Sequence, residues 1–212
     1  MNVIEAIYAR KSIRKFKDEV VPKEDILKLL ELATQAPSPK HQQNWNFVVC
    51  TNREIINEMA DIVTKSHERL GEIAKTKKDR KIHMSVIKYY TCFRNAPAVI
   101  IVYGSEYKMI EYKILKDNDA PQEVLDMLVS PQSAAQGIGA AVENFLLAAT
   151  EMGYGTCYMT GPTHAKVEIE KLIGFNKPGF ELMSIIALGV PEENTPPKPA
   201  RKPLEDVVTF ID

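Results

Sequence analysis

The chain lacks the features that mark several large classes of protein. Its 212 residues carry 27 basic and 28 acidic side chains, for a formal net charge of -1. This balance excludes a bulk attraction to nucleic acid or to an anionic membrane. The amphipathic N-terminus MNVIEAIYARK has too short an apolar run for a secretory signal. We therefore expect neither a nucleic-acid partner nor a membrane segment.

Cysteine and metal motifs are scarce as well. Cys50, Cys92 and Cys157 are odd in number and far apart in the chain, so we expect no disulfide framework and a reducing cytoplasm as the location. No CxxC pair or histidine pair has metal-ligand spacing, so no metal is predicted. A thiol nucleophile at Cys157, helped by His164, is an alternative. A cysteine in a strand is more often a small core residue.

The usual nucleotide and hydrolase motifs are also missing. Neither GxxxxGK[ST] nor GxSxG occurs. Gly137-Ile138-Gly139 begins like a dinucleotide fingerprint, but the third glycine and a preceding strand are absent. A Rossmann nucleotide site is therefore not predicted.

The hydrophobic pattern predicts alternating helices and strands in one domain, which indicates an α/β or α+β fold. Val3, Ile4 and Ile7 recur at helical spacing and are expected to face a core. Residues 104–130 show no clean period and predict a lid or binding loop, with Tyr107 and Tyr112 as weak candidates for substrate contacts. Helices are expected at about 22–33, 53–74, 133–152 and 163–173, and strands at about 47–50, 97–103, 156–159 and 183–190.

The C-terminal residues 191–212 predict an extended arm. Prolines crowd the stretch from Pro191 to Pro203, which cannot join a compact core in the ordinary way. Residues 207–211 resemble a strand and need a sheet edge with which to pair. Either they fold back on their own sheet or they reach a partner subunit, and we favour the partner.

A basic heptad, Arg10 to Phe16, follows the first predicted helix. Its Lys and Arg side chains suit the negative end of a helix dipole. Arg10, Lys11, Ser12 and Arg14 are also the donors that a phosphate prefers. The heptad is thus either a solvated helix end or a phosphate-binding arm.

Four segments together resemble the FMN-dependent nitroreductase family. They are the basic heptad, APSPKHQQNW at 36–45, GYGTCYMTG at 153–161 and RKPL at 201–204, in the order that the family has them. The resemblance implies an α+β fold, an α/β/α sandwich with a mainly antiparallel central sheet flanked by helices. It also implies a homodimer in which the C-terminal arm completes the partner's sheet.

The resemblance also implies where FMN would bind. The heptad would hold the phosphate, ribityl chain and one ring edge, and Arg201 would close the phosphate site, with Lys198 a weaker candidate. A backbone N–H near Thr160 or Gly161 would donate to flavin N5. Two positions depart from the family pattern: His41 replaces the usual Asn, and Asn44 replaces the usual Pro before Trp45. The implied cofactor-binding residues are Arg10, Lys11, Ser12 and Arg14, then Pro37, Ser38 and His41 from the other subunit, then Tyr158, Met159, Thr160, Gly161 and Arg201.

The implied activity is reduction of nitroaromatics, quinones or related electron-poor acceptors by ping-pong hydride transfer from NADH or NADPH. No side chain is expected to be catalytic, because the flavin N5 carries the chemistry. The alternatives are an FMN carrier or redox sensor without steady turnover, and a structural dimer that binds no flavin.

Overall fold

One antiparallel sheet organises the computed structural model, which describes residues 1–211. Its strands are β1 (Trp45–Cys50), β2 (Ala98–Ser105), β3 (Gly155–Met159) and β4 (Phe180–Gly189), in the order β1-β2-β4-β3. Each neighbouring pair is antiparallel. Seven of the eight residues of β2 are buried, as expected of a central strand that is covered on both faces.

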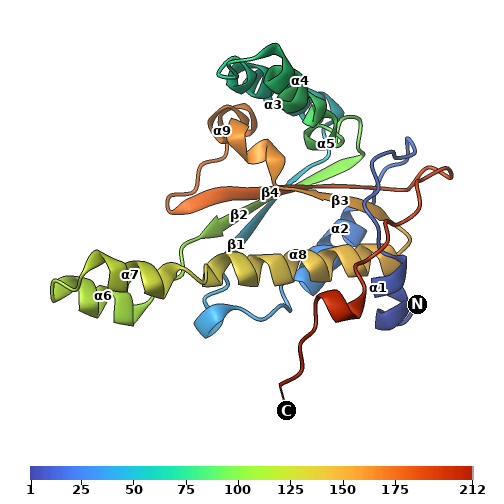
Figure 1. The fold of residues 1–212 in the computed structure, drawn as a ribbon. Coiled ribbons are helices and arrows are strands. Elements are labelled where there is room, and N and C mark those ends of the chain that lie inside the picture. The colour runs from blue at the N-terminus through green and yellow to red at the C-terminus, as the bar shows by residue number, and fades with distance from the viewer. Residues whose placement is uncertain (212) are drawn as a thin grey trace.

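Helices cover both faces of this sheet (Figure 1). Successive side chains of a strand point to opposite faces, so Val99 and Ile101 enter one core while Ile100 and Val102 enter the other. The first core lies under α3 (Arg53–Gly71), α5 (Ile87–Tyr90) and α9 (Lys166–Ile173), with α4 (Lys77–Ser85) packed against α3. The second core lies under α2 (Lys23–Ala33) and α8 (Ser133–Glu151). This arrangement confirms the predicted α+β fold with a mainly antiparallel sheet.

Residues 104–130, predicted to be a lid or binding loop, contain two short helices. They are α6 (Ile110–Asp117) and α7 (Gln122–Val129), which project from the body beside the start of α8 (Figure 1). We refer to residues 104–130 as the lid and to α6 and α7 as the lid helices. Ile110, Ile114 and Met127 are each more than half exposed. These apolar side chains are therefore left uncovered in a single chain.

The first helix, α1 (Val3–Ala9), corrects one prediction. Val3, Ile4 and Ile7 do not face the core: they are 65%, 63% and 49% exposed, and Ala6 is the residue of this helix that is buried. The helix is short and lies at the rim of the molecule, where it packs on α8 through its smallest side chain.

The C-terminal arm is extended, as predicted, but forms no strand within the described residues. It contains one turn of 3-10 helix, η3 (Leu204–Asp206), and Phe210 and Ile211 are 85% and 95% exposed. Asp212, the last residue of the predicted arm, lies outside the described residues. The predicted pairing with a partner's sheet is not tested by one chain.

Candidate functional site

The basic heptad lies along the outer edge of β3. The Ile13 N–H donates to the Thr156 carbonyl at 2.8 Å, and Ser12 and Thr156 form an isolated parallel bridge. Ile13 itself is buried against Gly155, where an added Cβ would lie 2.7 Å from its Cγ1. The glycine is therefore needed for the heptad to approach the strand so closely.

Arg10 ends α1 and begins this arm. Its backbone N–H donates to the Ala6 carbonyl at 2.8 Å, which closes the helix. Its guanidinium Nε lies 3.6 Å from a carboxylate oxygen of Glu143 on α8. Arg14 lies further along the arm, where its guanidinium carbon is 5.6 Å from the centre of the Tyr89 ring.

The Pro-rich C-terminal arm folds back onto the same end of the chain. The Lys11 ammonium donates to the Pro196 carbonyl at 3.0 Å, and the Lys198 ammonium donates to the Ile7 carbonyl at 2.9 Å. These bonds join segments more than 180 residues apart and carry Arg201 toward Arg10.

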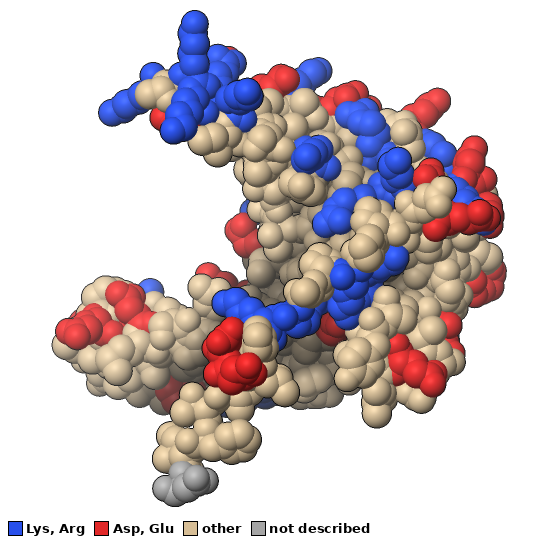
Figure 2. All heavy atoms as spheres, turned by 45° about the vertical axis from the view of Figure 1, so that its right-hand side comes forward, with Lys and Arg blue, Asp and Glu red and all other residues tan. Residues whose placement is uncertain are grey.

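The result is a cluster of cations with little to neutralise it. Desolvation lowers the pKa of Lys198, and the positive charges of Arg10 and Arg201 lower it further, while Glu143 opposes them. Within the described residues, the Arg10–Glu143 contact is the one ion pair that these three cations make. The view that brings this side forward shows Lys and Arg side chains in a band across the middle of the molecule (Figure 2). Such a cluster favours an anion.

The end of β3 adds a second element to this edge. Tyr158 and Thr160 are exposed, and Gly161 opens the 3-10 helix η2 (Gly161–Ala165). The first N–H groups of a helix have no partner inside it and are available to a ligand. Met159 differs from the prediction in one respect, because its side chain is buried and only its backbone can contact a ligand.

The remaining predicted site residues lie elsewhere. Pro37, Ser38 and His41 belong to the loop around η1 (Pro39–His41), which is on the far side of α8 from β3 (Figure 1). The Ser38 hydroxyl accepts from the Gln43 N–H at 3.0 Å. The loop borders a cavity of about 510 Å³, lined by Pro37, Ser38, Pro39, Ser133, Gln136, Gly137 and Ala140. One chain therefore does not bring the two sets of residues together.

The two departures from the family pattern sit in this loop. Asn44 is buried, and its amide donates to the Glu106 carbonyl at 2.8 Å. The Gln42 side chain makes two hydrogen bonds to the backbone of Lys108. It accepts one from the Lys108 N–H at 2.9 Å and donates the other to the Lys108 carbonyl at 2.7 Å. A proline at position 44 could not donate in this way, so Asn44 helps to fasten the loop to the lid. The other departure, His41, is exposed, with a positive φ of 56°.

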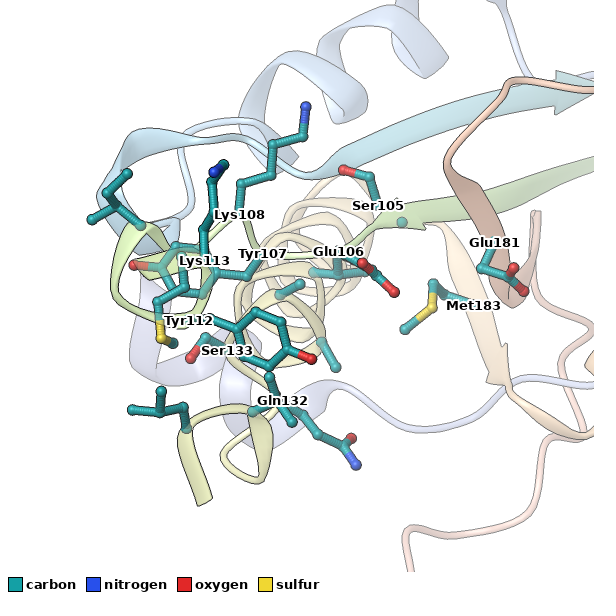
Figure 3. Close-up of a pocket in the computed structure, with 18 of the residues that line it drawn as sticks. Ser105, Glu106, Tyr107, Lys108, Tyr112, Lys113, Gln132, Ser133, Glu181 and Met183 are labelled. Carbon is teal, nitrogen blue, oxygen red and sulfur yellow. The ribbon is translucent and has the colours of Figure 1, made fainter. Parts of the chain in front are cut away.

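A larger cavity, of about 960 Å³, opens beneath the lid helices (Figure 3). Tyr107 and Tyr112 line it, as does Met183 from β4. Sequence reasoning missed the polar residues Glu106, Gln132 and Glu181, which have no motif and meet here only through the fold. The cavity walls combine aromatic, apolar and charged side chains, as a site for a small organic molecule requires.

A histidine cluster was also missed. The rings of His67 and His83 stack with centroids 3.8 Å apart, and each donates through Nε2 to the other's carbonyl at 2.9 Å. Burial lowers the pKa of nearby His164, and His67 and His83 lower it further. Among residues 1–211, no group of three or more His, Cys, Asp or Glu side chains is placed to hold a metal ion. No helix in the same range is long and apolar enough to cross a membrane.

Comparisons with known proteins place the chain in a family. A flavoprotein structure from Clostridium difficile 630, described as BluB-like, is 37% identical and superposes with a TM-score of 0.92 over all of both chains. A protein of Methanothermobacter thermautotrophicus, named for NADH dehydrogenase and NAD(P)H nitroreductase activities, is 31% identical over 92% of this chain and 80% of its own. Iodotyrosine deiodinase of Hydra vulgaris is 28% identical over 96% of this chain and 71% of its own.

The family model named Nitroreductase family matches residues 7–190, and this span contains every element from the end of α1 to the end of the sheet. The resemblance that the heptad and the loop motifs suggested is thereby confirmed. The chain belongs to the nitroreductase family.

Proposed function

We propose that this protein is an FMN-dependent oxidoreductase that reduces nitroaromatics, quinones or related electron-poor acceptors with NADH or NADPH, the whole chain acting as one flavin-binding domain. Its family supports the general class, a flavin oxidoreductase. The observation that carries the proposal is the cation cluster of Arg10, Lys198 and Arg201, beside the heptad whose Ser12 pairs with Thr156 of β3. Positive charge that the protein leaves unneutralised suits a phosphate group.

The residues present fit the cofactor that the family implies. The cation cluster would hold the phosphate, and the exposed Ser12 hydroxyl would contact the ribityl chain. The N–H groups at the start of η2 would face the N5 edge of the ring. Once bound, FMN supplies hydride acceptance from the nicotinamide and ping-pong transfer to a nitroaromatic, a quinone or a related acceptor.

The chain's own groups would bind, orient and tune. Arg10 and Arg201 hold negative charge in place by paired hydrogen bonds. Tyr90 packs on Gly161, where an added Cβ would lie 2.2 Å from a ring carbon. The start of η2 is thus held rigidly. The cavity beneath the lid would receive the acceptor and limit its size, with Tyr112 and Met183 among its walls.

A homodimer is part of the proposal. The loop around η1, which carries Pro37, Ser38 and His41, lies on the far side of α8 from β3 and would complete the site of a second copy. Exposed apolar side chains on α1, on the lid and on the C-terminal arm offer surface for that contact. A reducing cytoplasm is the proposed location, supported by the three free cysteines.

Two relatives of this chain are named for different reactions. One relative is named for nitroreductase activity and another is an iodotyrosine deiodinase, and both match nearly the whole chain. Relatives of this chain are thus named for different substrates, so the proposal covers a class of acceptors and not one compound.

The decisive experiment is the absorbance spectrum of the purified protein, followed by anaerobic titration with NADH and with NADPH. Flavin bands that bleach with one donor and recover on addition of a nitroaromatic or a quinone would support the proposal. Flavin bands that neither donor bleaches would support the carrier. A colourless protein that takes up no added FMN would refute both.

A further inference from the structure

Two cysteines that are 65 residues apart in the sequence meet beside the candidate site. The Sγ of Cys92, just after α5, lies 3.5 Å from the Sγ of Cys157 on β3. A disulfide places the sulfurs about 2.05 Å apart, so bond formation needs an approach of about 1.5 Å. We propose that Cys92 and Cys157 form a reversible disulfide and that this pair is a redox modification site.

The surroundings favour reaction at this pair. The Cys92 thiol donates toward the sulfur of Cys157, and this contact lowers the pKa of Cys157. The positive charge of Arg14 and a hydrogen bond from Ser12 lower it further, against burial. The thiolate is the reactive form of a cysteine, so Cys157 reacts first with an oxidant.

Cys92 is the more accessible of the two sulfurs, and contact with Cys157 and burial raise its pKa, so it takes part as a thiol. It is partly exposed, whereas Cys157 is 3% exposed. The Met159 sulfur lies 3.2 Å from the Cys92 sulfur, on the side of the core. Cys157 is held in the sheet opposite Ala187, but Cys92 belongs to the turn after a four-residue helix. The turn is therefore the part that moves.

The chemistry balances with a hydroperoxide as the oxidant. The Cys157 thiolate attacks the peroxide, which takes two electrons from that sulfur and converts it to a sulfenic acid, and the alkoxide or hydroxide that leaves takes up a proton. Cys92 then attacks the Cys157 sulfur, loses its thiol proton and forms the disulfide. Hydroxide leaves and takes up a proton to become water. A dithiol reductant reverses the bond by thiol–disulfide exchange.

Cys50 provides a control within the same chain. It is a buried thiol on β1 whose Sγ lies 3.7 Å from the Asn52 carbonyl, and burial raises its pKa. Within residues 1–211 its sulfur contacts no other thiol. A reagent that merely oxidised any thiol would not distinguish Cys50 from the pair.

Oxidation of the cysteine pair is also expected to affect the proposed FMN site. Tyr90 precedes Cys92 by two residues and packs directly on Gly161. Drawing the turn toward β3 shifts this ring, so the disulfide should alter FMN affinity. This second consequence rests on the proposed function, whereas the disulfide itself does not.

The test treats the reduced, full-length protein with a few equivalents of hydrogen peroxide, then alkylates the remaining thiols under denaturing conditions. We expect two of the three thiols to be lost, the mass of two hydrogens to disappear, and dithiothreitol to restore both. A digest should yield one cross-linked peptide pair that contains Cys92 and Cys157. Cys50→Ser should behave in the same way, while Cys92→Ser and Cys157→Ser should form no internal disulfide.

Three alkylatable thiols in treated wild-type protein would overturn the proposal, as would a cross-link that involves Cys50. The wild-type digest decides the matter even if a serine variant fails to fold. FMN binding is measured separately on the oxidised and reduced forms. A protein that forms the disulfide but binds no FMN in either form would refute the proposed function and leave the modification site standing.

Discussion

Replacing Gly155 with alanine tests whether the basic heptad is fastened to β3 in the way described. The position has ordinary strand geometry, so alanine meets no backbone penalty there. Its Cβ would instead lie 2.7 Å from Ile13 Cγ1 and 2.8 Å from Ile13 Cβ. Real Cβ atoms do not approach so closely, and both atoms belong to the stiff, branched base of the side chain. The heptad must therefore move away from the strand.

The cost follows from what that movement breaks. Overpacking a well-packed site costs about 1–3 kcal/mol. Loss of the 2.8 Å hydrogen bond from the Ile13 N–H to the Thr156 carbonyl accounts for about 1 kcal/mol of this destabilisation. Gly155→Ala should therefore lower the free energy of unfolding by about 1–3 kcal/mol. Because Arg10 and Arg14 move with the heptad, FMN binding should weaken as well.

Urea denaturation and flavin fluorescence titration measure the two effects. Gly139→Ala is the matched control, because a Cβ there meets nothing within 4 Å and the residue lies inside α8. Alanine favours a helix over glycine by about 0.5–1 kcal/mol, so this variant should be as stable as the parent or more so. A Gly155→Ala protein with the parent's midpoint and the parent's FMN affinity would refute the packing argument.

Three further predictions concern the charges and the termini. Arg201→Ala should weaken FMN binding about 10- to 150-fold, which is equivalent to about 1.5–3 kcal/mol for a charged hydrogen bond. The guanidinium of Arg94 pairs with Asp61, away from the candidate site, so Arg94→Ala should leave FMN binding unchanged. The pKa of His164 is lowered below 6.5 in the folded state, so the free energy of unfolding should fall as the pH drops below 6.5, by at most about 1.4 kcal/mol per pH unit. His164→Gln should reduce this pH dependence, as measured by denaturation curves at several pH values. Truncation before Pro196 should give a monomer in light scattering, and a truncated protein that stays dimeric would contradict the role of the arm.

The parts of the fold that follow from local pattern could be predicted. The continuous apolar run at 97–103 became the buried strand β2, and the long small-residue segment became α8, which ends at Gly153 with a positive φ of 85°. The motifs that resemble the nitroreductase family were also visible, because phosphate donors and tight turns demand particular residues at fixed spacing.

What sequence could not supply was the pairing of distant residues. No sequence pattern predicts that Cys92 lies beside Cys157, or that the Asn44 amide donates to the Glu106 carbonyl. The error at Val3, Ile4 and Ile7 has the same origin. Helical spacing identifies an apolar face, but it does not tell whether that face lies against the chain's own core or at its rim.

The contacts of the η1 loop link two functions that the proposed dimer would otherwise keep apart. Pro37, Ser38 and His41 would contact the ring of the flavin held by the other subunit. The same loop is tied to the lid by the Gln42 clamp on Lys108 and by the ion pair of Lys40 with Glu111 at 3.0 Å. Loop and lid would therefore arrive at the other subunit's flavin as one unit. The wall that selects an acceptor is thus fastened to the loop that positions the ring, whereas the phosphate is held by the opposite chain.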